Sequence, residues 1–183
     1  MNPVAFIEML GGAVLEAELF YDEAPNTVAS FVDLCRDGFY DGLTFHRIVK
    51  DYIIQSGAPN GSCEGNEAPF FIKGEFAENG FSTKLRHLTG ALSMARRRGF
   101  DTASTQFFIV CGEAGRLDGK YAVFGRLNGD ESYRILQRLA NLPVTSREEG
   151  NKPLEPQIIR TIRIERAESV RLPDRLPPVE PDD

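Results

Sequence analysis

The chain has 183 residues, of which 42% are hydrophobic and 26% charged, and its formal net charge is −6. This length is typical of one domain with or without a tail, and the composition excludes collagen, coiled coils and wholesale disorder. The negative charge argues against a nucleic-acid partner, which needs a basic surface, and no apolar run approaches the roughly 20 residues that cross a membrane.

The first predicted element is a β-hairpin. Two apolar-rich runs, Val4–Leu10 and Val14–Phe20, flank Gly11 and Gly12. In the second run polar and apolar residues alternate, which is the period of a half-buried strand. Two consecutive glycines allow the positive φ angles of a tight turn, so the runs are expected to pair through it.

A helix is predicted to begin at Pro25. Apolar side chains then recur at helical spacing and would form one stripe: Val28, Phe31, Val32 and Cys35. Asn26 or Thr27 is a plausible N-cap, and Gly38 is the expected stop.

Between residues 42 and 124 the chain consists of short apolar runs separated by glycine-rich loops. The runs that we interpret as strands are Phe45–Val49, Tyr52–Ile54, Phe70–Ile72, Ala91–Met94, Phe107–Val110 and Ala122–Phe124. Many short strands with glycines between them favour a closed or sandwich-like β architecture over alternating strands and helices.

A second helix is predicted at Glu131–Ala140, ended by Pro143, and a last strand at Gln157–Glu165. The helix would bury Ile135, Leu136 and Leu139, and the strand would place Ile158, Ile162 and Ile164 on one face. The chain after this strand is acidic and contains four prolines, Pro173, Pro177, Pro178 and Pro181. Such a segment has too few apolar groups to order itself, so we expect a flexible tail.

The cysteines and histidines do not indicate a metal site. Cys35, Cys63 and Cys111 are an odd number without CxxC spacing, and the N-terminus lacks the basic region of a secretory signal. Reduced thiols and a cytoplasmic location are therefore expected. His46 and His87 have no zinc-ligand spacing with the cysteines, and we expect both to be structural.

Arg47 and Gln55 are polar residues within apolar segments. Arg47 lies between apolar neighbours in a predicted strand, and Gln55 follows it eight positions later. A charged side chain on a mostly apolar strand must reach water, a partner or a ligand, because unpaired burial is costly. Taken alone, this segment is better explained by an arginine that points to solvent.

A second polar group strengthens the case for a binding surface. Gln106 and Phe108 are two positions apart in a predicted strand and share a face, whereas Phe107 points to the other side. Together with Arg47 and Gln55 they would bind an apolar ring beside a peptide carbonyl. The alternative is that the phenylalanines belong to the core, which we expect of one of the two.

Five blocks of sequence occur in a fixed order. They are Phe45-His46-Arg47-Ile48, Gln55-Ser56-Gly57, Gly90-Ala91-Leu92-Ser93-Met94-Ala95, Ser104-Thr105-Gln106-Phe107-Phe108-Ile109 and Leu117-Asp118-Gly119-Lys120-Tyr121-Ala122-Val123-Phe124-Gly125. In order and spacing they closely resemble the signature blocks of the cyclophilins, which are peptidyl-prolyl cis–trans isomerases. The resemblance implies a mainly β fold, a closed eight-stranded antiparallel β-barrel capped by two α-helices, with the substrate groove on its outer wall. It also implies an isomerase domain at residues 1–166, followed by the tail at residues 167–183.

The resemblance further implies roles for single residues. Arg47 matches the catalytic arginine. The positions that would bind substrate are Tyr52, Ile53, Gln55, Ala95, Arg96, Gln106, Phe108, Leu117 and Tyr121. Among them Phe108 and Ile53 would form the floor of a proline pocket, and the backbone of Ala95 and Arg96 would pair with the substrate. No cofactor or metal is implied, and a monomer is expected to act on proline-containing peptides and on unfolded or flexible protein segments.

Several positions depart from the family pattern, among them Tyr52 and Ile53, where the family more usually has Phe and Met. Arg116 stands where many cyclophilins have Trp, which puts cyclosporin binding in doubt because an aromatic wall and an indole donor are missing. Tyr121 takes a position that is often His and keeps a flat ring with a polar edge. The run Arg96-Arg97-Arg98 replaces a more neutral segment, and we hypothesise that its charges favour acidic residues beside the substrate proline.

Two other functions remain open. One is a proline-peptide binding module or chaperone-like scaffold with little turnover, and the other is a structural barrel whose groove is blocked. The sequence Leu176-Pro177-Pro178 motivates the further hypothesis that the tail docks in the chain's own groove.

Overall fold

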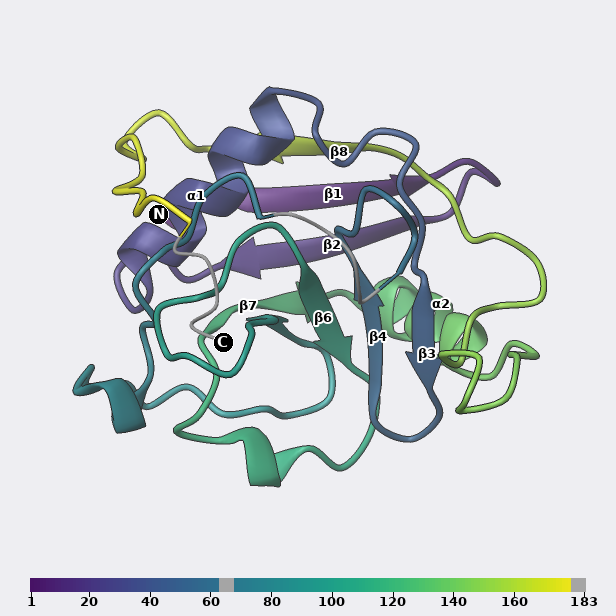
Figure 1. The fold of residues 1–183 in the computed structure, drawn as a ribbon. Helices are drawn as coiled ribbons and strands as arrows, with labels where there is room; N and C mark the ends of the chain where they lie inside the picture. The colour runs from purple at the N-terminus through teal and green to yellow at the C-terminus, as the bar shows by residue number, and fades with distance from the viewer. Residues whose placement is uncertain (63–67, 179–183) are drawn as a thin grey trace.

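The computed structural model describes residues 1–62 and 68–178. Eight strands form one antiparallel sheet in the order β3-β4-β6-β5-β7-β2-β1-β8, accompanied by two α-helices (Figure 1). The strands are β1 (Val4–Met9), β2 (Val14–Leu19), β3 (Arg47–Val49), β4 (Ile53–Ser56), β5 (Ala91–Met94), β6 (Phe107–Val110), β7 (Val123–Asn128) and β8 (Ile159–Glu165). The helices are α1 (Pro25–Arg36) and α2 (Asp130–Ala140), and two 3-10 turns occur at Ala77–Asn79 and Gly115–Leu117.

The sheet curls strongly but does not close, so the prediction of a closed barrel is wrong. Within the described residues, β3 and β8 form the two edges of the sheet and share no ladder. The loop before β3 is joined to the start of β8 by an isolated bridge between Thr44 and Ile158. The Phe45 N–H donates to the Gln157 carbonyl at 3.0 Å. The Ile159 N–H donates to the Leu43 carbonyl and the Ile159 carbonyl accepts from the Gly42 N–H, both at 2.8 Å. Because β3 has only three residues, the chain that faces β8 is loop and cannot extend a ladder across the seam.

The predicted N-terminal hairpin is confirmed. Strands β1 and β2 pair with Ile7 opposite Leu15. The turn closes with a hydrogen bond from the Gly12 N–H to the Met9 carbonyl at 2.9 Å, and Gly12 has a φ of +90°, a conformation that side chains disfavour.

The last strand forms as predicted, but its expected inner face is wrong in part. Ile162 is buried, whereas Ile158 and Ile164 are only half-buried and Ile159 is fully buried. The register of β1 against β8 shifts beside Met9, which adds one residue to the β8 side. A bulge of this kind reverses the alternation of side chains, so the inner face changes its parity along the strand.

Helix α1 begins at Pro25 as predicted, but its cap differs from the prediction. The N-cap residue is Ala24, whose side chain makes no capping hydrogen bond. Instead the buried Glu75 carboxylate accepts the N–H groups of Asn26 at 3.0 Å and of Thr27 at 2.8 Å, and the Thr27 hydroxyl at 2.6 Å. A carboxylate distant in sequence therefore satisfies the free donors of the helix start.

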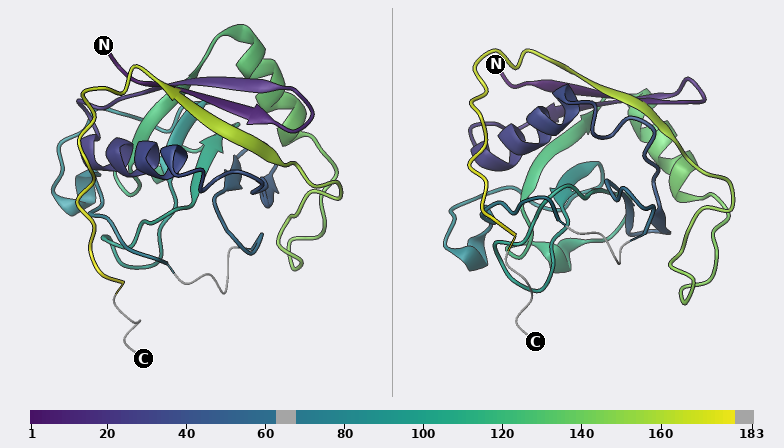
Figure 2. Two further views of the ribbon diagram at one scale, coloured as in Figure 1. Left: turned by 90° about the horizontal axis from the view of Figure 1, so that it is seen from above. Right: turned by 45° about the horizontal axis from the view of Figure 1, so that its top comes forward.

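Helix α2 buries Ile135, Leu136 and Leu139 as predicted. It packs mainly against β2 and β7, whereas α1 packs against β8 and β7, and the two helices lie apart in both views of Figure 2. Both contribute to the main core on the inner side of the curled sheet. Neither helix of the described chain has the length and apolar composition of a membrane span.

The predicted strand at Phe70–Ile72 does not form. Each side of this segment has a single bridge, from Phe71 to Leu176 and from Ile72 to Ala103. The described part of the tail, coloured yellow in Figures 1 and 2, follows β8 and passes α1, and the bridge to Phe71 is made by its Leu176. The domain boundary at residue 166 and the flexibility of the tail stay predictions.

Candidate functional site

Three neighbouring strands place the predicted site residues in one row. Arg47 in β3 lies directly opposite Gln55 in β4, which lies opposite Phe108 in β6. Residues directly opposite each other in antiparallel strands project from the same face, so the three side chains share the outer face of the sheet. The alternating residues Ile54 and Phe107 are fully buried in the main core.

A chain of hydrogen bonds joins the polar side chains beside this row. Arg47 donates from Nη1 to Gln55 Oε1 at 3.2 Å, and Gln55 donates from Nε2 to Gln106 Oε1 at 2.9 Å. Gln55 is only 7% exposed, whereas Arg47 and Gln106 are half-buried. Because a guanidinium has five N–H donors, the bond to Gln55 orients Arg47 and leaves it donors for a ligand.

Gly57 allows the segment that carries Gln106 to approach β4. A Cβ at Gly57 would lie 2.3 Å from the Thr105 carbonyl oxygen and 2.8 Å from the Gln106 Cα. The φ of Gly57 is +94°, and the Thr105 hydroxyl donates to its carbonyl at 2.9 Å. A side chain at this position would push Gln106 out of the row.

A second apolar cluster lies beside the polar row. Its buried members are Ile53, Ala91, Phe108, Val110, Ala114 and Val123. Leu117 and Tyr121 pack against it, and the Tyr121 ring meets the Phe108 ring edge to face, with centroids 6.0 Å apart. The arrangement presents an apolar depression next to the donors of Arg47.

The buried side chain of His87 packs against the ring of Phe108. The two rings are stacked, with centroids 6.0 Å apart and 16° between their planes. His87 Nδ1 lies 2.9 Å from Asp118 Oδ1 and Nε2 lies 2.9 Å from the Ser93 hydroxyl, while the His87 backbone N–H donates to the same Asp118 oxygen at 2.7 Å. Burial lowers the pKa of His87. These contacts agree with a structural role, although sequence reasoning did not connect this histidine with Phe108.

All the sequence-predicted site residues line one open groove of about 1090 Å³. The further lining residues are Ala68, Arg97, Thr102, Ser104, Thr105 and Arg116. Of these, Arg97 was noted from the sequence for the charge of its arginine run, and Arg116 as the replacement of a family Trp. The small residues were missed because they lie in loops, where no periodicity marks the side that faces a ligand.

Arg96 is held by contacts within the protein. Its guanidinium lies over the rings of Tyr121, Phe76 and Phe100, at 4.6, 5.1 and 5.3 Å from their centroids. Its Nε donates to the Lys120 carbonyl at 3.0 Å. These contacts hold the backbone of residues 95–98 against Tyr121. Because the Arg96 guanidinium is engaged within the protein, it contributes less to the predicted attraction of acidic substrate residues.

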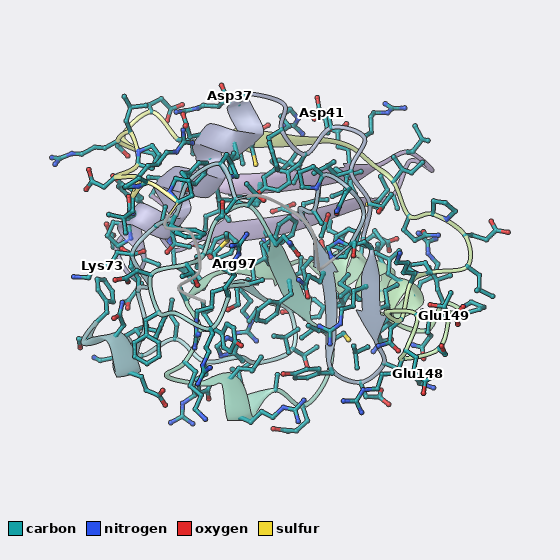
Figure 3. The ribbon with its side chains drawn as sticks, in the orientation of Figure 1. Asp37, Asp41, Lys73, Arg97, Glu148 and Glu149 are labelled. Carbon is teal, nitrogen blue, oxygen red and sulfur yellow. The ribbon has the colours of Figure 1, made fainter. Side chains whose placement is uncertain are left out.

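Arg97 and Arg116 place two exposed cations on the groove. The Arg97 guanidinium lies 5.5 Å from the centroid of the Phe71 ring. The Arg116 guanidinium lies 4.3 Å from that of Tyr52 and donates from Nε to the Tyr52 hydroxyl at 3.4 Å. Figure 3 shows Arg97 in the middle of the view, far from the labelled carboxylates at its right and upper edges.

The described cysteines and histidines, and the described tail, do not line the groove. Within the described residues, no group of three or more His, Cys, Asp or Glu side chains could hold a metal ion. Cys35 and Cys111 are free thiols, and Cys63 lies outside the described residues. No residue of the described tail lines the groove, which gives no support to the hypothesis that the tail docks there.

Comparisons with known proteins agree with this geometry. The family model described as cyclophilin type peptidyl-prolyl cis-trans isomerase/CLD matches residues 7–164. A peptidyl-prolyl cis-trans isomerase of Synechococcus elongatus is 41% identical over 136 residues, which are 70% of this chain and 88% of that protein. A spliceosome-associated protein CWC27 homologue of Xenopus laevis is 36% identical over 151 residues, which are 82% of this chain but only 30% of the longer protein.

Solved structures show the same fold. A crystal structure of a Cryptosporidium parvum cyclophilin type peptidyl-prolyl cis-trans isomerase superimposes with a TM-score of 0.75 at 30% identity, covering 90% of this chain and 98% of that one. The structure obtained in the presence of the dipeptide Ala-Pro gives a TM-score of 0.73 at 31% identity, covering 88% and 98%. The chain belongs to the family of cyclophilin-type peptidyl-prolyl cis–trans isomerases.

Proposed function

We propose that this chain accelerates cis–trans rotation of X–Pro peptide bonds in proline-containing peptides and in unfolded or flexible protein segments, and so assists folding. The observation that carries the proposal is the hydrogen-bonded chain of Arg47, Gln55 and Gln106 beside the apolar depression at Phe108. The Ala-Pro dipeptide named with the Cryptosporidium parvum structure supports a proline ligand for a groove of this family.

The chemistry of the X–Pro bond defines what the groove must do. Partial double-bond character raises the barrier to rotation to about 18–20 kcal/mol, and uncatalysed exchange takes tens to hundreds of seconds. No covalent bond is made or broken, so the reaction requires neither a nucleophile nor a cofactor. It requires a site that binds the twisted amide better than either planar form.

Arg47 supplies a donor that meets this requirement. In the twisted amide the nitrogen regains lone-pair density, and a guanidinium N–H can donate to it or to the prolyl carbonyl. The guanidinium stays charged near neutral pH. A charged donor that bonds mainly in the transition state is worth about 1.5–3 kcal/mol, which is roughly ten- to a hundredfold in rate. Arg47 therefore carries a part of the catalysis.

The rest of the rate enhancement is assigned to the apolar depression and the two amides. Phe108, with Ile53 and Leu117, would hold the proline ring and remove water from the bond. Gln55 and Gln106 would orient the substrate backbone while they fix Arg47. With the proline ring held, rotation about the X–Pro bond moves the carbonyl group of the residue before proline, while the prolyl nitrogen stays beside the Arg47 guanidinium.

An isomerisation assay on a proline peptide tests the proposal with wild type, Arg47→Ala and the control Arg138→Ala. Arg138 is an exposed arginine on α2, outside the groove. We expect Arg47→Ala to lower kcat/KM by about ten- to a hundredfold and the control to match wild type. Wild-type activity no higher than that of Arg47→Ala would reject catalysis and favour the proline-peptide binding module.

We also propose a monomer in a reducing compartment such as the cytoplasm. Burial, together with the charge of Asp41, raises the pKa of Cys35, which makes this thiol unreactive. Free Cys35 and Cys111 support reducing conditions.

A further inference from the structure

The end of the described chain is tied to the segment Phe70–Ile72 by backbone and side-chain contacts. The Leu176 N–H donates to the Phe71 carbonyl at 2.7 Å, and the Phe71 N–H donates back to the Leu176 carbonyl at 2.8 Å. The Arg175 guanidinium lies 4.0 Å from the centroid of the Phe70 ring and forms an ion pair with Asp33 of α1 at 2.7 Å. The tail thus joins α1 to this segment (Figure 2).

A second pair of hydrogen bonds anchors the tail at the start of α1. The Asp174 N–H donates to Asn26 Oδ1 at 2.7 Å, and Asn26 Nδ2 donates to the Asp174 carbonyl at 3.0 Å. Asn26 is itself held, because its backbone N–H donates to Glu75. Residues 174–176 therefore contact rigid helix on one side and the segment Phe70–Ile72 on the other.

The segment that the tail holds supports one wall of the groove. The Ile72 N–H donates to the Ala103 carbonyl at 2.9 Å, and both sequence neighbours of Ala103 line the groove. The ring of Phe71 lies under the guanidinium of Arg97, another lining residue. A displacement of Phe71 would reach this wall directly.

Among the described residues the backbone of this segment has few other hydrogen-bond partners, although the side chains of Phe70 and Ile72 pack in the main core. It forms a single bridge on each side and belongs to none of the named strands. Phe71 is buried, so loss of its partner would leave a buried carbonyl and N–H without the hydrogen bonds that Leu176 supplies. Local opening of such a segment costs less free energy than opening of the sheet.

We propose that residues 174–176 are a positioning strap for the substrate groove. The strap fixes the segment Phe70–Ile72, and through it the wall formed by Arg97 and the neighbours of Ala103. It lies outside residues 7–164 that match the family, so it is an addition to the shared fold. The inference rests on the proposed function of the groove. Arg47 and Gln55 belong to β3 and β4 and not to the wall that the strap supports, so we expect release of the strap to act mainly on substrate binding.

The test compares Leu176→Pro with Leu172→Pro. Proline has no backbone N–H, so Leu176→Pro removes the donor to Phe71. Leu172 is in the same tail, is 82% exposed and also precedes a proline, which makes it a matched control. We expect Leu176→Pro to raise KM by about two- to tenfold with kcat unchanged, and to speed amide hydrogen exchange at Ile72. The control Leu172→Pro is expected to match wild type in KM, in kcat and in the rate of amide exchange at Ile72.

Arg175→Ala provides a second variant that leaves the backbone intact, and it should shift KM in the same direction. Faster exchange at Ile72 with an unchanged KM in both variants would overturn the strap, because the tail would then be structural only. Equal behaviour of Leu176→Pro and Leu172→Pro would also overturn it. If wild type does not isomerise the peptide, the proposed function fails. The strap proposal is then tested by measuring the Kd of the same peptide in a fluorescence titration, where we expect Leu176→Pro to bind about two- to tenfold more weakly than wild type and Leu172→Pro. Equal Kd values would overturn the strap proposal.

Discussion

At the scale of single residues, the groove depends on side chains that fix one another. Gln55 is the centre of this arrangement, because its amide accepts from Arg47 on one side and donates to Gln106 on the other. A side-chain amide offers an acceptor oxygen and donor N–H groups in one planar, uncharged unit, so it can bridge the two neighbours. The position of Arg47 relative to a substrate is therefore set by a residue in the next strand.

Replacing Gln55 with leucine tests this dependence. The variant keeps a side chain of similar size but removes both hydrogen bonds, so we expect kcat/KM to fall by about tenfold through a less well oriented Arg47. Gln137→Leu, at an exposed position on α2, serves as the control. An unchanged kcat/KM in Gln55→Leu would show that Arg47 is positioned without this amide.

Two buried histidines predict that acid weakens the fold. Burial lowers the pKa of His46 to about 4 and also lowers that of His87, whereas histidine in an unfolded chain titrates near 6.5. Between these values the unfolded chain takes up protons that the folded chain excludes, so stability falls as the pH falls. Each histidine that stays neutral adds up to about 1.4 kcal/mol per pH unit to this slope.

Urea unfolding of wild type and His46→Gln at several pH values between 7 and 4.5 measures the effect. We expect the free energy of unfolding of wild type to decrease toward acid pH more steeply than that of His46→Gln, by up to about 1.4 kcal/mol per pH unit. Parallel slopes would mean that His46 titrates normally in the folded chain.

At the scale of elements, helix α1 illustrates how a loop completes a helix. Its own sequence places no capping side chain at Ala24, and the Glu75 carboxylate from the loop after Phe70–Ile72 accepts three hydrogen bonds at the helix start. The same loop is tied to Asp101, which accepts the Gly74 N–H at 2.9 Å. Helix, loop and groove wall are therefore one connected unit.

Removing the Glu75 carboxylate should destabilise this unit. We expect Glu75→Ala to lower the free energy of unfolding by about 2 kcal/mol, because the half-buried N–H of Asn26 and the buried N–H of Thr27 lose their acceptor. Glu78→Ala, at an exposed position in the same loop, should change it by less than about 0.5 kcal/mol. Denaturant titration of both variants decides the point, and equal losses would contradict the capping role.

Elements with their own periodicity were predictable, and those that depend on distant partners were not. Alternation located the hairpin, and helical spacing located α1 and α2, because these patterns reflect one buried face. Strands β5 and β6 are buried on both faces and were located as short apolar runs. The bulge in β8 was missed, since the register of β1 against β8 decides it. The segment Phe70–Ile72 was interpreted as a strand because it is a short apolar run, but within the described residues it forms only isolated bridges, to Leu176 and Ala103.

At the scale of the whole molecule, the groove is lined by positive charge although the chain as a whole is negatively charged. The formal net charge is −6, yet the described residues that line the groove include four arginines and no Asp or Glu. The arginines are Arg47, Arg96, Arg97 and Arg116. A basic groove on an acidic protein concentrates positive potential where a substrate binds.

This charge distribution predicts a preference for acidic residues beside the substrate proline. For peptides that differ only in one flanking residue, we expect kcat/KM to be about two- to fivefold higher with Glu than with Lys at low salt. The difference should shrink at 0.5 M NaCl, roughly the range in which exposed charges are screened within a few ångströms. Equal values for both peptides at low salt would reject the preference.

The sequence alone determined the family and the groove residues, because its five blocks resemble the cyclophilin signature blocks that carry the site, and its short apolar runs between glycines indicated the mainly β architecture. Tertiary structure decided what depends on partners far along the chain: the open seam between β3 and β8, the cap of α1, and the place of the tail against Phe71. It also decided that Arg96 is held by three aromatic rings while Arg97 and Arg116 remain exposed. A sequence states which residues are charged or apolar, but the contacts that engage each charge arise only when distant segments pack together.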